Sequence, residues 1–305
     1  MIYITLEENL EETNKKIKFF KKRFFKLKNK YSKLKEERFE NLVLITLPNI
    51  EEYTLNKLLS YIKIKCVNRV CISDSLANNT EFIEFINSQQ IKICDGKWLF
   101  QYLMYQCAEY IILCKKERLE YQEISILSNS ISSVLIDSIY ELASKIKILN
   151  IITEYENRFR KIEKELYEKK GILLNINNNY QKGLIKSDII FNFDFSEEEL
   201  NKYVLPKKGC IINFNNDIKI NSKAFEGINS NFYDIQMPQK YLKNSVFLKD
   251  FNNVALYESY IYKKTSPQNI KDEIKKDEIS ITFLNGKNGK IRKNEYLNLS
   301  KKVAN

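Results

Sequence analysis

Apolar positions in residues 123–154 change their spacing twice, and these changes divide the segment into predicted elements. Residues 124–127 and 146–152 are short apolar runs rich in isoleucine, which is typical of parallel strands covered on both faces. Between them, apolar residues recur every three or four positions, as on the buried face of a helix: Val134, Leu135, Ile139 and Leu142. The segment is therefore predicted to form a strand, a tight turn, a helix and a second strand, which is the layout of a βαβ unit.

The same alternation continues beyond this unit and predicts one larger α/β domain over residues 121–262. Strands are expected at residues 172–176, 188–193 and 210–214, and helices at residues 156–169, 197–203 and 249–262. Apolar strands separated by helices indicate a parallel sheet. We therefore expect a five-stranded, Rossmann-like sheet with the strand order 3-2-1-4-5, in which residues 124–127 form the central strand.

A smaller α/β domain with a linking helix is predicted over residues 41–120. Strands are expected at residues 42–47, 69–73 and 91–94, with helices at residues 50–62 and 76–86. Residues 98–115 predict a long helix that is apolar on most faces, and such a helix should lie between layers or between domains. The predicted fold class is α/β, with a parallel sheet in each of two domains.

The two ends of the chain have patterns of their own. Within residues 1–40, a basic amphipathic helix is predicted at residues 13–40, because apolar residues step along it by three and four positions: Ile17, Phe20, Phe24, Leu27, Tyr31 and Leu34. Such a seam packs on its own domain or on a second copy of the chain, as in a homo-oligomer. Residues 263–305 predict a polar linker and a β-hairpin, because Asn285-Gly286 and Asn288-Gly289 are strong turn signals.

The net charge of +11 lies almost entirely in the predicted N-terminal helix. Residues 15–38 hold twelve basic and two acidic side chains, so the rest of the chain is close to neutral. A membrane surface, nucleic acid and an acidic protein stay open as partners of this helix, beside the simpler interpretation of a solvated, packed helix. Only seven of the fifty basic residues are arginine, which argues against specific base readout.

The residue types present limit the chemistry. The chain has no histidine, which excludes Ser-His-Asp and Cys-His catalysis, and no conventional zinc or iron site is predicted. None of the six cysteines is paired as C-x-x-C, and several lie in apolar segments, which predicts reduced thiols. No run of eighteen apolar residues and no signal peptide is visible, so a cytoplasmic protein is expected.

The tight turn of the βαβ unit is the first candidate binding site. Ser128, Ser130 and Ser133 stand where a dinucleotide-binding G-x-G-x-x-G turn has its glycines. Glu154 follows the second strand, where an acidic residue accepts hydrogen bonds from a ribose. A serine hydroxyl can donate to a phosphate, but its Cβ blocks the closest approach. Two interpretations stay open: a site for NAD or NADP, with Glu154 favouring NAD, and an α/β domain that has lost its cofactor.

Further candidates follow from where doubly wound sheets bind ligands, which is outside the carboxyl ends of the strands. Asn192, Asp194 and Asn213 come at or after the ends of two such strands and are predicted to contribute to cofactor binding. Asp95 and Lys97 flank a glycine after the third strand of the smaller domain, and we nominate them as a catalytic acid–base pair. The alternative is a strand-to-helix turn in which Asp95 is a helix cap.

One passage resembles a known family. Residues 186–213 resemble the fourth-to-fifth strand passage of two-domain dehydrogenases of the shikimate and methylenetetrahydrofolate types, where A-D-I-V-I-x-A precedes a short helix and K-P-G-A-x-V-I-D. Here Ser187-Asp188-Ile189-Ile190 and Pro206-Lys207-Lys208-Gly209-Cys210-Ile211-Ile212-Asn213 follow that pattern. The resemblance implies a two-domain Rossmann fold and an NAD(P)-dependent oxidoreductase. The glycines of the phosphate turn are missing, and the family's catalytic lysine pairs have no matching motif here.

Three functions follow from these observations. The first is a cytoplasmic, Rossmann-like protein that binds a nucleotide or a small acidic metabolite without demonstrated catalysis, and the missing glycines favour it. The second is the NAD(P)-dependent oxidoreductase that the resemblance implies. The third is a scaffold that binds a polyanion or a protein partner through the basic helix.

Overall fold

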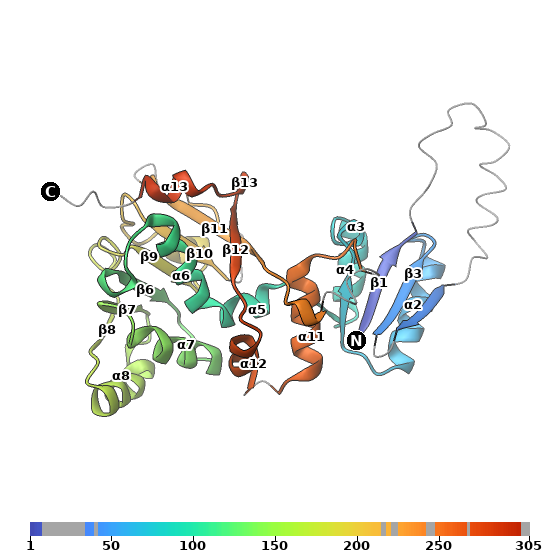
Figure 1. Ribbon diagram of the computed structural model, residues 1–305, viewed down its shortest axis with the longest axis horizontal. Helices are drawn as coiled ribbons and strands as arrows, with labels where there is room; N and C mark the ends of the chain where they lie inside the picture. Colours follow the sequence, from blue (N-terminus) through green and yellow to red (C-terminus); the bar gives the residue numbers. More distant parts are fainter. Residues whose placement is uncertain are drawn as a thin grey trace. The chain divides into compact units, whose positions relative to one another are not determined.

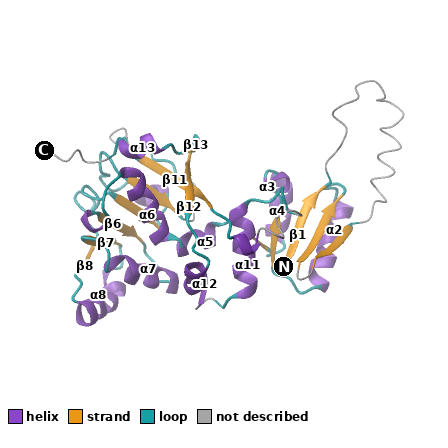
Figure 2. Ribbon diagram, in the orientation of Figure 1, coloured by secondary structure: helices purple, strands orange, loops and turns teal. Residues whose placement is uncertain are grey.

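The computed structural model describes residues 1–7, 34–39, 42–214, 218–220, 225–241, 248–266 and 269–299. The chain divides into two compact units, each with its own sheet (Figure 1, Figure 2). Unit 1 is formed by Met1–Gly96 and Met237–Asn269, and unit 2 by Lys97–Gln236 and Ile270–Asn305. Among the described residues, both sheets are mostly parallel, with five strands in one and eight in the other. The predicted α/β class with two α/β domains is therefore confirmed.

Unit 1 is built around the N-terminal strand. Its strands are β1 (Ile2–Leu6), β2 (Lys35–Phe39), β3 (Leu42–Leu47), β4 (Arg69–Ile72) and β5 (Lys92–Ile93), in the order β2-β3-β1-β4-β5. β1 pairs in parallel with β3 and β4, whereas β2 runs antiparallel to β3. Its helices are α2 (Glu52–Ile64), α3 (Asp74–Ala77), α4 (Thr80–Ser88) and α11 (Asn253–Lys264).

The positions of β1 and β2 correct part of the prediction for residues 1–40. Residues 2–6 form the middle strand of the sheet, and residues 35–39 form an edge strand, where a helix is expected as far as residue 40. Ile2, Tyr3 and Ile4 are all buried, because a middle strand is covered on both faces. A run of five residues is too short for its period to separate a strand from a helix. The rest of the predicted seam, from Ile17 to Tyr31, lies outside the described residues.

Unit 2 contains the predicted doubly wound sheet. Its strands are β6 (Glu123–Leu127), β7 (Ile148–Ile152), β8 (Leu174–Asn177), β9 (Ile189–Asn192), β10 (Cys210–Asn213), β11 (Ile228–Ile235), β12 (Ile281–Gly286) and β13 (Gly289–Lys290). Their order is β8-β7-β6-β9-β10-β11-β12-β13, and β6 to β10 pair with one another only in parallel. The predicted order 3-2-1-4-5, with residues 124–127 at its centre, is confirmed for these five strands.

Helices and loops pack against this sheet. The helices are α5 (Lys97–Tyr102), α6 (Met104–Lys115), α7 (Ser133–Ala143), α8 (Glu156–Lys170), α9 (Glu197–Leu200), α12 (Ile270–Lys276) and α13 (Lys293–Leu297), and residues Leu119–Tyr121 form a 3-10 turn. α7 packs against β7 and α8 against β8. Leu127 and Ile152 share a core with Leu184 and Leu200, which come from the loop after β8 and from α9. These contacts place α9 and that loop over one face of the strands.

The two units differ from the predicted domain boundaries at two helices. The helix expected over residues 98–115 is interrupted at Leu103 and belongs to unit 2, where the Phe100 ring stacks on Tyr233 with 4.1 Å between the centroids. The helix expected over residues 249–262 is α11 of unit 1, in which the Glu258 carboxylate pairs with the Arg69 guanidinium at 2.8 Å. Apolar spacing predicts that a helix has a buried face, but it does not identify the sheet that covers it.

The C-terminal hairpin is part of the larger sheet. β12 and β13 pair antiparallel with Gly286 opposite Gly289, so the predicted hairpin is present. β12 also pairs antiparallel with β11, which makes the hairpin a sheet edge and not an appendage. β11 itself was not predicted, because its sequence INSNFYDI interleaves polar and apolar residues without a clear run. Within the described ranges, no helix combines the length and the apolar composition needed to cross a membrane.

Candidate functional site

The carboxylate of Asp194 fills the turn between β6 and α7, which we call the serine turn (residues 128–130). Its Oδ1 accepts a hydrogen bond from the backbone N–H of Asn129 at 2.8 Å. Its Oδ2 accepts hydrogen bonds from the backbone N–H of Ser130 at 2.8 Å and from the Ser130 hydroxyl at 2.5 Å. The Ser128 hydroxyl shares its one hydrogen between this oxygen, at 3.0 Å, and the Ser130 carbonyl, at 2.8 Å. Two backbone amides and two hydroxyls therefore converge on one internal carboxylate.

A second turn, held by Asn192, presents Asp194 to the serine turn. The Asn192 side chain accepts a hydrogen bond from the backbone N–H of Phe195 at 2.9 Å and donates one to the Phe195 carbonyl at 3.0 Å. Both bonds fold the backbone sharply after β9. Because β9 lies beside β6 in parallel, the tip of this turn meets the end of β6. Phe193 and Phe195 are buried on either side of Asp194, so the carboxylate is held in one place.

Asn129 connects the serine turn to the next strand and to α9. Its Oδ1 accepts a hydrogen bond from the backbone N–H of Glu154 at 2.9 Å, and its Nδ2 donates to the Glu199 carboxylate at 3.0 Å. The Arg158 guanidinium donates to the Asn129 carbonyl at 2.9 Å. The sequence analysis missed Asn129, because an asparagine in a turn is common and these partners lie 25, 29 and 70 residues away.

Most of the predicted cofactor-binding residues meet at this edge of the sheet. Ser128, Ser130 and Asp194 share the network, and Asn192 shapes it. Asn213 lies beside them and accepts a hydrogen bond from Asn192 Nδ2 at 3.0 Å. Its own Nδ2 donates to the side chains of Asn229 at 2.8 Å and Asn231 at 2.7 Å. The amide of Asn213 is therefore used within the protein.

Two other predicted cofactor-binding residues, Glu154 and Ser133, lie outside the Asp194 network with their side chains. Glu154 joins the network through its backbone N–H, while its carboxylate lies 3.8 Å from the Lys202 ammonium. Ser133 is the exposed first residue of α7. The neighbouring Ser132 caps that helix, because its hydroxyl accepts a hydrogen bond from the Leu135 N–H at 3.2 Å. Neither the Glu154 carboxylate nor the Ser133 hydroxyl takes part in the Asp194 contacts.

The network leaves the serine turn little capacity for a phosphate. In a dinucleotide site, the turn amides and the helix N-terminus bind the pyrophosphate. Here the Asp194 carboxylate, whose oxygens accept hydrogen bonds as phosphate oxygens do, already receives both amides and both hydroxyls. A phosphate in the same place would have to displace this carboxylate or lie beside a like charge. The serine turn is an anion site that the protein occupies itself.

The nominated acid–base pair lies at the division between the units. Asp95 is exposed in unit 1 and follows β5, and Lys97 is the first residue of α5 in unit 2. Gly96 between them has a φ of 82°, a left-handed conformation that favours glycine. The catalytic role of Asp95 and Lys97 stays a prediction.

Four buried thiols are poor nucleophiles because burial raises their pKa. Burial raises the pKa of Cys210 to about 12 and raises the pKa of Cys71, Cys94 and Cys107 well above the ordinary thiol value. The thiolate is the reactive form, so these four side chains are held in the unreactive one. Within the part of the chain that the structure describes, no group of three histidine, cysteine, aspartate or glutamate side chains is arranged to hold a metal ion.

Comparisons with known proteins show a distant resemblance of fold. No protein-family model and no curated protein sequence matches the chain. A shikimate dehydrogenase solved with NADP+ is 12% identical over 87% of this chain and 96% of that chain, with a TM-score of 0.32. Shikimate 5-dehydrogenase from Listeria monocytogenes, solved with shikimate and NAD, is 10% identical over 90% of this chain and 95% of that chain, with a TM-score of 0.33.

Carbamoyltransferases resemble the chain to a similar degree. Anabolic ornithine carbamoyltransferase from Campylobacter jejuni is 9% identical over 85% of this chain and 86% of that chain, with a TM-score of 0.30. Scores at this level carry no inference about activity. The chain has a distant structural resemblance to two-domain Rossmann-fold dehydrogenases and to carbamoyltransferases, and its function has to be argued from its own residues.

Proposed function

We propose that this protein binds a small acidic metabolite and does not hold NAD or NADP at the serine turn. The single observation that carries the proposal is the Asp194 carboxylate, which takes the hydrogen bonds of Asn129, Ser130 and Ser128. A dinucleotide would need these donors for its pyrophosphate.

An acidic ligand is supported by donors elsewhere in unit 2. The side-chain amides of Asn177 and Asn179 and the ammonium groups of Lys182 and Lys186 line one pocket. Within the described residues, these nitrogens have no hydrogen-bond or ion-pair acceptor. Surplus donors favour a ligand that brings acceptors and negative charge.

The alternative is the NAD(P)-dependent oxidoreductase that residues 186–213 suggest. In the structure, this passage has a packing role. The Ser187 hydroxyl bonds the Ser125 hydroxyl at 2.6 Å, and the Asp188 carboxylate accepts from the Glu123 N–H at 3.1 Å. A Cβ on Gly209 would lie 3.2 Å from the Ser187 carbonyl, so close packing favours glycine there. These contacts account for the pattern without a cofactor.

The scaffold function through the basic helix stays a separate prediction. Residues 15–33 of that segment lie outside the described residues, and residues 35–38 belong to β2. The geometry of the residues that the structure describes does not favour one of nucleic acid, a membrane surface and a protein partner for it.

Calorimetric titration of the full chain with NAD and NADP tests the proposal. We expect no binding heat for either dinucleotide. An Asp194→Ala variant, checked for folding by circular dichroism, should gain weak binding of inorganic phosphate, because its turn donors lose their internal acceptor.

Tight binding of NAD or NADP by the wild-type chain would overturn the proposal. Ser130→Tyr then identifies the place, because bulk at this position would block a pyrophosphate on the serine turn. A loss of binding in that variant would restore the oxidoreductase alternative.

A further inference from the structure

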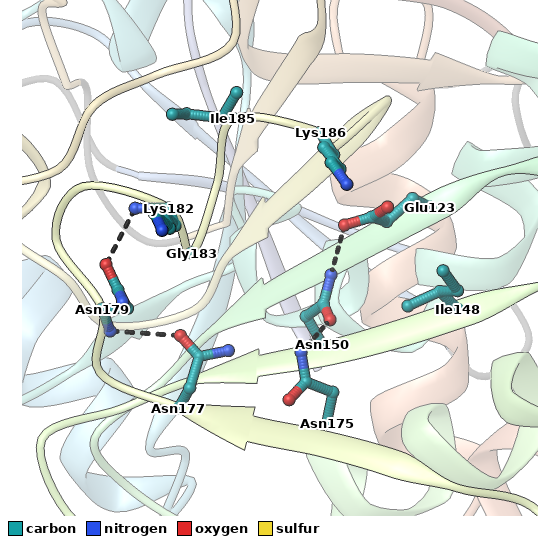
Figure 3. A pocket seen from close by; sticks show the side chains of 10 residues that line it. All are labelled: Glu123, Ile148, Asn150, Asn175, Asn177, Asn179, Lys182, Gly183, Ile185 and Lys186. Atoms are coloured by element: carbon teal, nitrogen blue, oxygen red, sulfur yellow. Dashed lines mark hydrogen bonds between the residues drawn. The ribbon is translucent and has the colours of Figure 1, made fainter.

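A second polar site lies on one face of the sheet of unit 2, and it extends from the first residues of β6 and β7 to the last residue of β8 and the loop that follows it. It is a pocket of about 560 Å³. Figure 3 shows its ten lining residues: Glu123, Ile148, Asn150, Asn175, Asn177, Asn179, Lys182, Gly183, Ile185 and Lys186. We call it the asparagine pocket. Its residues come from β6, β7, β8 and the loop after β8, all within unit 2.

The pocket exists because one crossover of the sheet has no helix. The chain leaves β8 at the edge and must pass β7 and β6 to reach β9. It does so in residues 178–188, a fully described stretch of turns. In doubly wound sheets such a crossover is ordinarily helical and covers the strands beneath it. Here the short loop leaves part of the sheet face open.

The strands beneath the loop carry polar residues in register. Ser125 lies opposite Asn150, and Asn150 lies opposite Asn175, so the three side chains form a row across β6, β7 and β8. Asn150 Nδ2 donates to the Glu123 carboxylate at 3.0 Å, and Asn175 Nδ2 donates to Asn150 Oδ1 at 2.7 Å. A carboxylate only accepts hydrogen bonds, so this chain of bonds fixes the orientation of both amides.

The loop fixes two more amides in the same way. Asn177 Oδ1 accepts from the backbone N–H of Asn179 at 3.1 Å. Asn179 Oδ1 accepts from the backbone N–H groups of Gln181 at 3.1 Å and Lys182 at 2.8 Å. Backbone N–H groups only donate, so the acceptor atom of each side chain is committed to the loop. The donor atoms, Nδ2 of Asn177 and of Asn179, are the ones left over.

The loop is also tightly built, so these donors are held in place before any ligand binds. The Gly183 N–H donates to the Asn179 carbonyl at 2.8 Å. A Cβ on Gly183 would lie 2.7 Å from the Asn179 carbonyl oxygen and 3.0 Å from Asn177 Oδ1, so only glycine allows this approach. Pre-set donors lower the entropy cost of binding.

We propose that the asparagine pocket binds one oxyanion group, a carboxylate or a phosphate, of a small metabolite. The amides of Asn177 and Asn179 and the ammonium groups of Lys182 and Lys186 supply the donors. Glu123, at the β6 side of the pocket, repels a second anionic group placed there. The inference rests on the proposed function and gives that function a place and a ligand chemistry.

Titration calorimetry with four probes tests the pocket: lactate, succinate, inorganic phosphate and glycerol 3-phosphate. We expect the full chain to bind lactate or glycerol 3-phosphate at millimolar concentration, and to bind succinate more weakly than lactate because of Glu123. The comparison of lactate with glycerol 3-phosphate separates a carboxylate from a phosphate ligand. The double variant Lys182→Ala, Lys186→Ala should bind the preferred probe at least about tenfold more weakly.

Lys161→Ala is the matched control, because Lys161 is an exposed lysine of α8 outside the pocket lining. It should bind as the wild type does. Unchanged affinity in the double variant overturns the pocket and leaves the proposed function standing. A third outcome has two parts: the double variant loses phosphate binding, and the wild-type chain binds a dinucleotide at the serine turn. This outcome overturns the proposed function but supports the asparagine pocket. No binding of any probe to the wild-type chain overturns both.

Discussion

The serine turn and the asparagine pocket are two polar clusters of one sheet, and they balance donors and acceptors in opposite ways. At the serine turn, two backbone amides and two hydroxyls meet the Asp194 carboxylate, so the donors are matched. In the asparagine pocket, the amide oxygens of Asn177 and Asn179 are consumed by the loop, while their donor atoms are left over. A matched cluster stabilises the fold, whereas a cluster with surplus donors can bind an acceptor from outside.

A sequence motif indicates the first cluster but not the second. Serines at glycine positions mark a turn that can bind an anion, but the same donors serve a phosphate or an internal carboxylate equally well. The pocket has no such motif. It depends on a missing helix and on register across three strands.

The largest effect is expected from Asp194→Ala, which removes the acceptor of the matched cluster. Its loss leaves two backbone amides and two hydroxyls without their charged partner, so we expect the free energy of unfolding to fall by about 2 to 4 kcal/mol. Urea unfolding followed by circular dichroism measures the change. Asp194→Asn should lower the free energy of unfolding nearly as much, because the amide nitrogen of the new side chain would face N–H or O–H donors.

Glu198→Gln is the matched control for Asp194. Glu198 is an exposed carboxylate of the first turn of α9, four residues along the chain, and its removal should change stability by less than about 0.5 kcal/mol. Equal stability losses in the Asp194 and Glu198 variants would mean that the serine turn does not depend on an internal acceptor.

The next effect is expected from Gly183→Ala, which disturbs the loop of the unmatched cluster. The added methyl would lie 2.7 Å from the Asn179 carbonyl oxygen, so the loop must shift and the free energy of unfolding should fall by about 1 to 3 kcal/mol. Binding of the preferred anion should fall with it. Calorimetry and urea unfolding measure the two effects on one preparation.

Gly171→Ala is the control for Gly183→Ala, because it lowers stability through backbone strain at a position outside the asparagine pocket. Gly171 has a φ of +65°, and a Cβ there would meet no atom within 4 Å, so the substitution costs backbone strain of about 1 kcal/mol. Its anion affinity should equal that of the wild type. Weakened binding in both glycine variants would point to general destabilisation and would weigh against the loop as part of the site.

A smaller effect is expected from Asn175→Ala, at the exposed end of the polar row. The substitution removes the donor that reaches Asn150 Oδ1 at 2.7 Å, and Asn150 is only 2% exposed. We expect a stability loss of about 1 kcal/mol, because a nearly buried acceptor loses its bond. Asn175→Asp should weaken anion binding more than Asn175→Ala does, since it adds a like charge to the pocket. Equal anion affinities for the two variants would place the ligand away from the row.

Much of the fold of unit 2 could be predicted, because its strands are buried on both faces and read as apolar runs. Ile124, Ile151 and Ile211 belong to such runs, and their order in the sheet is the expected one. Unit 1 was harder, because it is assembled from two separate stretches of chain. β1 precedes a charged segment, and α11 joins from residues 253–264, so neither is placed by its neighbours in sequence.

The sequence predicts that residues of the serine turn meet Asp194, whereas their part in cofactor binding stays a prediction. Ser128, Ser130 and Asp194 were each expected at the cofactor edge, and they do meet there. What the sequence could not show is that Asp194 is itself the anion. This contact spans 64 residues between Ser130 and Asp194 and depends on the turn that Asn192 holds. In a sequence, a carboxylate near hydrogen-bond donors fits two arrangements equally well: it can bind a ligand together with these donors, or it can take the place of an anionic ligand.

The smallest effect is expected at a third polar cluster, which is matched like the serine turn but is centred on a cation. Lys271 of α12 donates to the Ser138 hydroxyl at 3.0 Å and pairs with the Glu141 carboxylate at 3.0 Å. Burial lowers the pKa of the Lys271 ammonium below its ordinary value of 10.5, against the opposing effect of Glu141. A matched partner therefore offsets only part of the cost of burying this charge.

Lys271→Met should change how stability depends on pH in the alkaline range. Between the lowered pKa of Lys271 in the folded chain and 10.5, this side chain binds more protons in the unfolded chain, so its contribution to the free energy of unfolding rises with pH by less than about 1.4 kcal/mol per pH unit. The methionine variant lacks this contribution, so its stability should fall behind that of the wild type as the pH rises through the window. Because Glu141 raises the pKa of Lys271, Glu141→Gln should widen the window toward lower pH. Urea unfolding at a series of alkaline pH values measures all three chains, and parallel curves for the wild type and Lys271→Met would show that burial of this ammonium is fully offset by its partners.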